Sequence, residues 1–216
     1  MAKDIYLLGG GGHASVLVDM LKANGVKVAY ICSPNVDPSR KTLSTIPVLA
    51  DEDVLLNKGP VELELVNGMG SLPGNALRKK LFCKFVEHGF SFKQVISMQA
   101  VISPYTSLGH GVQIMPGAIV QAGAVIGDNT IINTGAIIEH DCIIGKHNHI
   151  APGVVLSGQV NTGDYVHIGS GATVIQNISI GEDTVIAAGA TVTKSIEREK
   201  IVFGARANIQ NRKVKQ

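Results

Sequence analysis

A repeat of six residues occupies the second half of the chain and restricts its fold more than any other feature. From position 101 to position 196 the sequence divides without insertion into sixteen hexapeptides such as QIMPGA, IVQAGA and IINTGA. The second residue is aliphatic in fifteen of them, Thr162 being the exception, and the sixth is mostly small. A period of six fits neither an amphipathic helix nor a hairpin meander, but it suits a short strand and a tight turn repeated many times. We therefore predict stacked coils in which the second-position side chains form an aliphatic column.

The composition agrees with a narrow core of small aliphatic side chains. Of the 216 residues 45% are hydrophobic, yet only 4% are aromatic and Trp is absent. The net charge of +2 gives no reason to expect a nucleic-acid partner. Because neither a signal-peptide pattern nor a run of eighteen apolar residues is present, we expect a cytoplasmic protein without membrane insertion. The widely spaced Cys32, Cys83 and Cys142 indicate reduced thiols and form no metal motif.

The first half has a different texture, in which apolar strands alternate with helices. We predict strands over residues 4–8, 26–31, 61–68 and 93–97, and helices over residues 14–25, 51–57 and 75–89. Strand and helix in alternation favour a small parallel sheet covered by helices. The predicted organisation is thus a half-Rossmann-like α/β domain over residues 1–97 and an all-β repeat domain over residues 98–216, which includes a short C-terminal tail.

A glycine-rich turn follows the first predicted strand and opens the first predicted helix. Its sequence GGGGHA satisfies the G-x-G-x-x-[GA] pattern, and a helix start of this kind favours a bound phosphate. A dinucleotide-binding domain has an acidic residue at the end of the second strand, where this chain has CSPN, so one nucleotide diphosphate is favoured over NAD. A second turn, NGMG, is expected to close the other side of the pocket. The residues expected to bind substrate at these turns are Gly10, Gly11, Gly12, His13 and Gly68, with a helix-start role as the alternative for His13.

His140 is the strongest candidate for a chemical role. It lies in the sequence EHDC, at the fourth place of its hexapeptide, between Glu139 and Asp141. An imidazole titrates near neutral pH and can act as a general base, and a neighbouring carboxylate can fix its tautomer. On the residues alone, a solvated turn histidine among acids is the alternative. His149 and His167 open hexapeptides eighteen residues apart, so we expect them on the same edge of adjacent coils.

The hexapeptide run, the glycine turn and the EHDC motif together resemble the hexapeptide-repeat sugar acetyltransferases of the sialic acid O-acetyltransferase and UDP-bacillosamine N-acetyltransferase family. The resemblance spans residues 1–205. It implies a left-handed parallel β-helix with three hexapeptides per coil, acetyl-CoA as co-substrate, no metal, and a homotrimer in which CoA lies between adjacent β-helices. It also implies that His140 is the catalytic base and that Asp141, rather than Glu139, is its carboxylate partner.

The same resemblance assigns binding roles to further residues. It implies that a histidine contacts acetyl-CoA near its thioester, that small residues line the CoA edge, that the second-strand loop faces the nucleotide, and that an asparagine contacts the sugar. The residues so assigned are His149, Gly158, Ser170 and Ala188 for acetyl-CoA, and Ser33 and Asn133 for the nucleotide sugar. The chain departs from the family pattern in three places, since CSPN lacks the usual acid, no His-Pro precedes the first coil, and FGARA lacks its proline.

The function predicted from these features is N-acetylation of a UDP-linked 4-amino-4,6-dideoxy sugar, with the UDP-amino sugar and acetyl-CoA as the partners. O-acetylation of sialic acid or a related sugar is one alternative. The other is a non-catalytic or zinc-binding trimer resembling the γ-class carbonic anhydrases. Zinc accepts imidazole ligands, and four histidines lie close together in the sequence, namely His140, His147, His149 and His167.

Overall fold

The first part of the chain forms a small parallel sheet with helices on both faces. A computed structural model describes residues 3–61 and 63–205. Within these ranges the first sheet has the strands β1 (Asp4–Leu8), β2 (Val28–Cys32), β3 (Val48–Leu49) and β4 (Leu63–Asn67), in the order β3-β2-β1-β4. The helices are α1 (Gly12–Ala23), α2 (Val54–Lys58) and α3 (Leu77–Glu87). All pairings are parallel, so the predicted half-Rossmann-like sheet is confirmed.

Side-chain alternation along β1 explains why this sheet is covered on both sides. Ile5 and Leu7 belong to the buried cluster that contains α1, whereas Tyr6 and Leu8 belong to the cluster that contains α2 and α3. Successive strand residues point to opposite faces, so the apolar run from Ile5 to Leu8 needs cover on both faces of the sheet. Gly25 follows Asn24, the C-cap of α1, and has a φ of 72°, as is common for a glycine just beyond a helix end.

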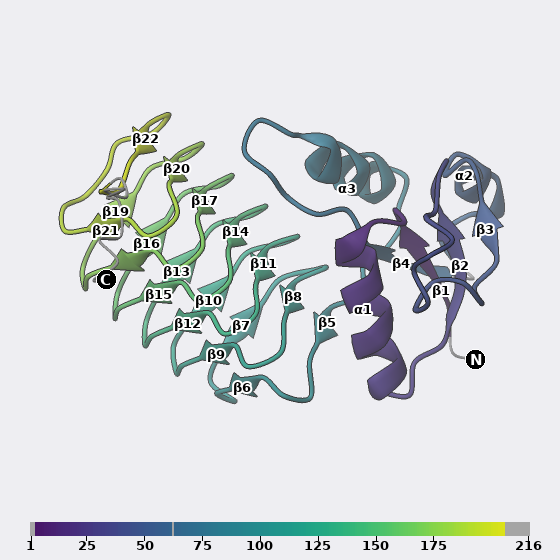
Figure 1. Cartoon of the computed structure of the whole chain (residues 1–216), viewed down its shortest axis with the longest axis horizontal. Helices are drawn as coiled ribbons and strands as arrows, with labels where there is room; N and C mark the ends of the chain where they lie inside the picture. The colour runs from purple at the N-terminus through teal and green to yellow at the C-terminus, as the bar shows by residue number, and fades with distance from the viewer. Residues whose placement is uncertain (1–2, 62, 206–216) are drawn as a thin grey trace, which may run out of the picture.

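The second part is a left-handed parallel β-helix whose coils are stacked beside the first sheet (Figure 1). Three sheets run along it in the described residues. The seven-stranded sheet contains β5 (Val95–Ile96), β8 (Gln113–Ile114), β11 (Ile131–Ile132), β14 (His149–Ile150), β17 (His167–Ile168), β20 (Val185–Ile186) and β22 (Ile201–Val202). The six-stranded sheet contains β6 (Val101–Ile102), β9 (Ile119–Val120), β12 (Ile137–Ile138), β15 (Val155–Leu156), β18 (Thr173–Val174) and β21 (Thr191–Val192). The five-stranded sheet contains β7 (Ser107–Leu108), β10 (Val125–Ile126), β13 (Ile143–Ile144), β16 (Asn161–Thr162) and β19 (Ser179–Ile180).

The second residue of each hexapeptide points into the β-helix, as predicted. Ile132 pairs with Ile150 on the next coil, and both are fully buried in one continuous apolar cluster. Thr162, the exception to the aliphatic rule, is buried as well. Its hydroxyl accepts hydrogen bonds from the Gly145 N–H and from Nδ2 of the buried Asn148, so the polar atom is satisfied inside the core.

The corners between the sheets depend on the fifth residue of the hexapeptide. From Gly111 to Gly189 this residue has a positive φ at every repeat, between 54° and 78°. Glycine adopts such angles freely, and Asn and Asp do so more readily than other residues, which explains the composition of this position. Asp141 is one of these corner residues, with a φ of 58°.

The strand predicted over residues 93–97 lies in a different sheet from the one expected. β5 pairs with β8 in the seven-stranded sheet, and the residues just before β5 reach the first sheet through a bridge between Phe92 and Leu65. α1 contacts β5. β5 is therefore a strand of the β-helix, and it is in direct contact with the first part of the chain through α1. Among the described residues, no helix combines the length and the apolar character needed to span a membrane.

Candidate active site

The glycine turn lies at the carboxyl end of β1, where the strand order of the first sheet reverses. Ligands of open parallel sheets bind at such a reversal point. Gly9 has a φ of 97° and donates its N–H to the Cys32 carbonyl, while Gly11 is the N-cap of α1 and supplies no side-chain cap. A β-carbon at Gly10 would lie 2.7 Å from Val36, and one at Gly9 would lie 2.5 Å from the Met69 sulfur. Neighbouring loops thus leave no room for a side chain at Gly9 and Gly10, and the first N–H groups of α1 lack a side-chain cap.

The two predicted flanks of this turn are in place. A β-carbon at Gly68 would lie 2.7 Å from the Leu8 carbonyl oxygen, so the second glycine turn lies directly against the end of β1. Ser33 is buried beside Gly10, and its hydroxyl donates to the Asn35 carbonyl at 2.8 Å. The Ser33 hydroxyl therefore bonds to its own loop in this structure, although it lies at the predicted position.

Arg40 is a cation at the glycine turn that the sequence analysis missed. A β-carbon at Gly12 would lie 3.5 Å from its Nη1, so the guanidinium is beside the first residue of α1. Its ion pair with Asp37 is long, at 3.8 Å, and its side chain is 37% exposed. Positive charge at the amino end of a helix opposes the helix dipole, so this arrangement is favourable when an anion lies between them. No motif marks Arg40, because it belongs to an irregular loop.

His13 connects the glycine turn to the β-helix. Its Nε2 lies 2.7 Å from Oε1 of Gln113 on β8, and Nε2 of Gln113 donates to the Asn67 carbonyl at 2.7 Å. The amide orientation of Gln113 is thereby fixed, so His13 donates from Nε2 and keeps a lone pair on Nδ1. Burial and the nearby Arg78 lower the pKa of His13 to about 4. A neutral His13 offers no N–H from Nδ1 to a phosphate, and the observed bond makes it a link between the two parts of the chain.

His149 and Asn133 form a second constellation on the seven-stranded sheet. Nδ1 of His149 lies 3.0 Å from the Ser71 carbonyl and therefore donates to it, while Nδ2 of Asn133 donates to Nε2 of His149 at 3.0 Å. The Asn133 orientation is fixed independently, because its Oδ1 accepts the Thr134 N–H at 2.8 Å. Burial and the neighbouring His167 lower the pKa of His149 to about 3. His149 is thus a neutral imidazole with no free N–H, whereas Asn133 retains a second N–H.

His140 and Asp141 form a hydrogen-bonded pair at the corner between β12 and β13. Nδ1 of His140 lies 2.9 Å from Oδ2 of Asp141, and both side chains are more than half exposed. The predicted carboxylate is therefore the one in contact with the imidazole. With Nδ1 donating to Asp141, Nε2 carries the lone pair and lies above the buried Gly158, where a β-carbon would come 2.6 Å from Cε1. The pair has the geometry of a general base and its orienting carboxylate.

One chain places these groups on two different edges of the β-helix. His140 and Gly158 lie at the corner between the six-stranded and five-stranded sheets, whereas the glycine turns, through Gln113 and Ser71, lie against the seven-stranded sheet. The other predicted CoA positions, Ser170 and Ala188, are exposed at a different corner, the one between the seven-stranded and six-stranded sheets. The sequence-predicted residues thus fall into separate groups within a single chain.

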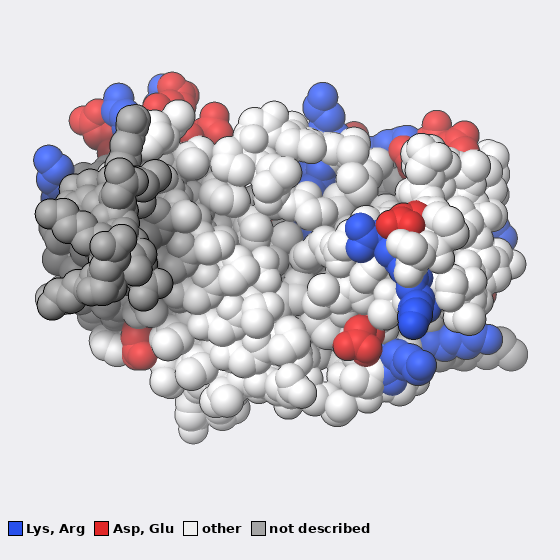
Figure 2. Space-filling view, viewed as in Figure 1, with Lys and Arg blue, Asp and Glu red and all other residues white. Residues whose placement is uncertain are grey.

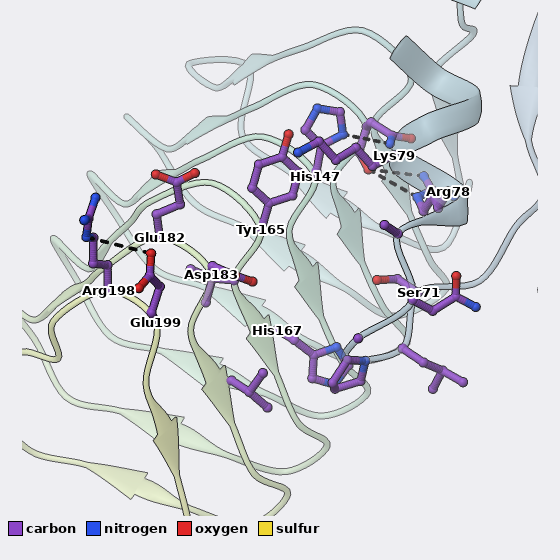
Figure 3. A pocket seen from close by; sticks show the side chains of 18 residues that line it. Ser71, Arg78, Lys79, His147, Tyr165, His167, Glu182, Asp183, Arg198 and Glu199 are labelled. Atoms are coloured by element: carbon purple, nitrogen blue, oxygen red, sulfur yellow. Dashed lines mark hydrogen bonds and ion pairs between the residues drawn. The ribbon is translucent and has the colours of Figure 1, made fainter. Parts of the chain in front are cut away.

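A pocket of about 460 Å³ lies between the start of α3 and the seven-stranded sheet (Figure 3). Nζ of Lys79 lies 3.5 Å from the centre of the Tyr165 ring, which stacks on His147. Arg78 lines the same pocket, and so does His167, whose Nδ1 is buried without a hydrogen-bond partner in the described residues. The pocket is adjacent to His149, because the ring centres of His149 and His167 are 4.9 Å apart.

The histidines do not assemble into a metal site in the part of the chain that the structure describes. Among residues 3–61 and 63–205 no group of three His, Cys, Asp or Glu side chains is arranged to hold a metal ion. His147 accepts a hydrogen bond from Nδ2 of Asn129 at 2.9 Å, and His149 is bonded as described above.

Comparison with known families and structures agrees with the geometry. The family model described as bacterial transferase hexapeptide (six repeats) matches residues 123–158 and 160–194, and the model of the PglD N-terminal domain matches residues 4–85. Comparison with curated protein sequences gives no match. Solved structures that resemble nearly the whole chain include the following three.

PerB from Caulobacter crescentus, solved with CoA and GDP-perosamine, is 36% identical with a TM-score of 0.83, over 98% of this chain and 99% of that chain. The acetyltransferase domain of PglB from Neisseria gonorrhoeae, solved with acetyl coenzyme A, is 28% identical with a TM-score of 0.84, over 94% and 97%. WeeI from Acinetobacter baumannii, at 22% identity and a TM-score of 0.81 over 94% and 97%, shares the fold. The chain therefore belongs to the family of hexapeptide-repeat sugar acetyltransferases that its sequence resembles, and it is an acyltransferase.

Proposed function

We propose that the protein transfers the acetyl group of acetyl-CoA to the amino group of a nucleotide-linked amino sugar. The observation that carries this proposal is the pair formed by Nδ1 of His140 and Oδ2 of Asp141, with Nε2 free above Gly158. An amine that attacks a thioester must lose a proton, and an imidazole held in this tautomer can accept it. The solved relatives support the substrate class, because PerB was determined with CoA and GDP-perosamine.

The reaction proceeds by direct attack. The neutral amine of the sugar attacks the thioester carbonyl carbon, and a C–N bond forms as the carbonyl oxygen becomes an oxyanion. Nε2 of His140 takes the proton from nitrogen, and Asp141 stabilises the imidazolium through Nδ1. Collapse of the tetrahedral intermediate breaks the C–S bond, and the imidazolium returns the proton to the CoA thiolate. The products are the N-acetylated sugar and free CoA.

Asn133 is better placed than His149 to stabilise the oxyanion. His149 presents a lone pair at Nε2 to Asn133 and donates its one proton to Ser71, so it has no N–H for a developing negative charge. Asn133 keeps one N–H beyond the bond to His149. The expected contact of His149 with acetyl-CoA is then one of packing, and the hydrogen bond comes from the amide.

The complete site requires a second copy of the chain. Within one chain the general base and the glycine turns lie on different edges, so a neighbouring β-helix must bring its His140 to the sugar held by the first copy. Figure 2 shows that a broad area of the β-helix surface on one face lacks charged side chains. Val125 and Ile143, which pair side by side on the five-stranded sheet, are 42% and 54% exposed. These features support the expected homotrimer with CoA between adjacent β-helices.

The nucleotide diphosphate is held at the glycine turn. The N–H groups at the amino end of α1 and the guanidinium of Arg40, which lies beside Gly12, would both bind its oxygen atoms. UDP and a 4-amino-4,6-dideoxy sugar are our specific proposal for the acceptor. The loop after β2 lacks an acidic side chain from Cys32 to Val36, so the choice between uracil and guanine falls to other groups of the pocket.

The test is an acetyl-transfer assay with the purified full chain. CoA release from acetyl-CoA is followed with UDP-linked and GDP-linked 4-amino sugars, and with free sialic acid for the O-acetyl alternative. We expect turnover with a nucleotide-linked amino sugar and a product that has gained one acetyl group on nitrogen. A wild-type protein that binds acetyl-CoA but acetylates none of the amino sugars would overturn the proposal, and acetylation of sialic acid alone would replace it.

A further inference from the structure

Arg78 is a buried cation at the junction between the α/β part and the β-helix. Its side chain belongs to α3 and is only 4% exposed. Nη1 donates to the carbonyls of Asn67 at 2.9 Å and Met69 at 2.7 Å, and Nη2 donates to the carbonyl of Asn129 at 3.2 Å. Burial lowers its pKa to about 9, so the guanidinium remains protonated at neutral pH. Figure 3 shows Arg78 at the wall of the pocket, where α3 approaches the β-helix.

No carboxylate among the described residues pairs with Arg78, and every acceptor it uses is a backbone carbonyl. A buried charge without a counterion is costly, and backbone dipoles compensate it only when several converge in the right geometry. Helix α3 has enough apolar side chains on this face, including Leu81, Phe82 and Phe85, to be anchored without a buried arginine. The cost of burying Arg78 therefore points to a task other than holding α3 in place.

The carbonyls that Arg78 holds belong to two different parts of the site. Asn67 and Met69 form the second glycine turn, and the Met69 sulfur packs against Gly9 of the first turn. Asn129 is a corner residue of the β-helix, and its Oδ1 accepts a hydrogen bond from Nδ2 of Asn67 at 3.1 Å. One planar fork thus joins the turn to the β-helix.

A second set of hydrogen bonds connects the same two parts of the chain. The Asn67 carbonyl also accepts from Gln113, which in turn accepts from His13 at the start of α1. Asn67, Gln113 and Asn129 are each at most 1% exposed, so water does not compete for these bonds. A fully connected buried polar network specifies one arrangement of the groups that it joins.

We propose that Arg78 is a positioning residue for the nucleotide-sugar site, and that its fork fixes the second glycine turn against both the first turn and the β-helix. The inference rests on the proposed function, since it assumes that these turns hold a nucleotide diphosphate. A lysine keeps the charge but cannot span three carbonyls in a plane. The orientation of the turn, rather than the charge alone, then determines how well the diphosphate is bound.

The experiment compares Arg78→Lys and Arg78→Met with Lys80→Met, which removes an exposed cation from the same helix. The full-length proteins are titrated calorimetrically with UDP, with GDP and, separately, with acetyl-CoA, and their melting temperatures are measured. We expect both Arg78 variants to weaken nucleoside-diphosphate binding at least tenfold while the Kd for acetyl-CoA stays within twofold of wild type. Lys80→Met leaves both values unchanged. In turnover, KM for the amino sugar rises more than kcat falls.

Three results separate the possible failures. Wild-type affinity for nucleoside diphosphate in Arg78→Lys overturns the positioning role. A parallel loss of acetyl-CoA binding and of melting temperature in both variants also overturns it, because it shows that Arg78 supports the whole fold. A wild-type protein that binds neither UDP nor GDP overturns the proposed function itself, whatever the variants do.

Discussion

The imidazole of His140 lies over Gly158 of the next coil, in the space that a side chain at position 158 would need. On the opposite side, a β-carbon at Gly123 of the preceding coil would collide with Oδ1 of Asp141. The hydrogen-bonded pair therefore lies between Gly158 on the next coil and Gly123 on the preceding coil. Gly158 has no positive φ, and the three atoms nearest to a β-carbon at this position all belong to the His140 imidazole, which explains the absence of a side chain.

Gly158→Ala should therefore lower kcat without unfolding the protein. The new methyl group displaces the imidazole, and a misplaced general base loses about 10²-fold in rate. Gly25→Ala is the control, because it strains a residue with a φ of 72° but has no neighbour within 4 Å. We expect this control to lower the melting temperature and leave kcat at the wild-type value. The prediction fails if Gly158→Ala is the more active of the two.

His140→Ala should remove most of the turnover. A positioned general base contributes about 10²–10⁴-fold, so kcat should fall by that factor while acetyl-CoA binding is retained. His110→Ala is a matched control, since His110 is also the fourth residue of a hexapeptide and is exposed. Equal rates in the two variants would remove His140 from the mechanism.

Asn133→Asp should separate the roles of Asn133 and His149. The carboxylate repels both the oxyanion and the His149 lone pair, and loss of one oxyanion donor costs about 10²–10³-fold in kcat. Asn161→Asp, an exposed change on another sheet, should have no effect. The kcat of each variant is measured by steady-state kinetics at saturating acetyl-CoA. A change confined to KM for the sugar would instead support the sugar-contact role predicted for Asn133 from the sequence.

Arg40→Met should weaken binding of the nucleotide sugar. The guanidinium beside Gly12 makes a charge-assisted contact with the diphosphate, so KM for the acceptor should rise about tenfold, and more steeply at low salt. Lys41→Met, at the exposed neighbouring residue, is the control and should behave as wild type. If the two variants have the same KM, Arg40 is not a phosphate ligand.

Acidification should loosen the junction between the two parts of the chain. His13 and His149 have folded-state pKa values of about 4 and about 3, below the ordinary value of 6.5, so the unfolded chain binds protons that the folded chain does not. Their stabilising effect is complete above pH 6.5 and declines as the pH falls toward these lower values. Each residue should cost about 2 kcal/mol of unfolding free energy between pH 7 and pH 5. Denaturant titrations of wild type and of His13→Gln, which keeps a donor near Gln113, should differ in this pH dependence. Identical slopes would contradict it.

The β-helix was predictable because its signal is repeated. Each hexapeptide has one inward residue and one corner residue. The inward residue is aliphatic in fifteen of the sixteen hexapeptides, so the one exception, Thr162, does not obscure the pattern. The choice of Asp141 over Glu139 as the partner of His140 came from the resemblance to the acetyltransferase family, and the contact of 2.9 Å between the two side chains agrees with it. The catalytic role of the pair stays a prediction until it is assayed.

The junction was not predictable, because its contacts join residues that are far apart in the sequence. His13 meets Gln113 across 100 residues and His149 meets Ser71 across 78 residues, and no motif records either pair. Two signals were nevertheless present. Gln113 is a polar first residue among hexapeptides that mostly start with aliphatic or small ones, and Arg78 lies three, four and seven residues before the buried Leu81, Phe82 and Phe85.

The parallel register of the corners has a consequence for how such an enzyme can change its substrate. Each coil repeats after eighteen residues, as in the pairing of Val125 with Ile143, and neighbouring strands lie about 4.8 Å apart. A His-Asp pair moved to the next equivalent corner would therefore shift by one such step along the axis. Proton transfer tolerates only a fraction of that distance. The base can thus be relocated only in whole coils, and finer adjustment of acceptor length must come from the loops that hold the diphosphate.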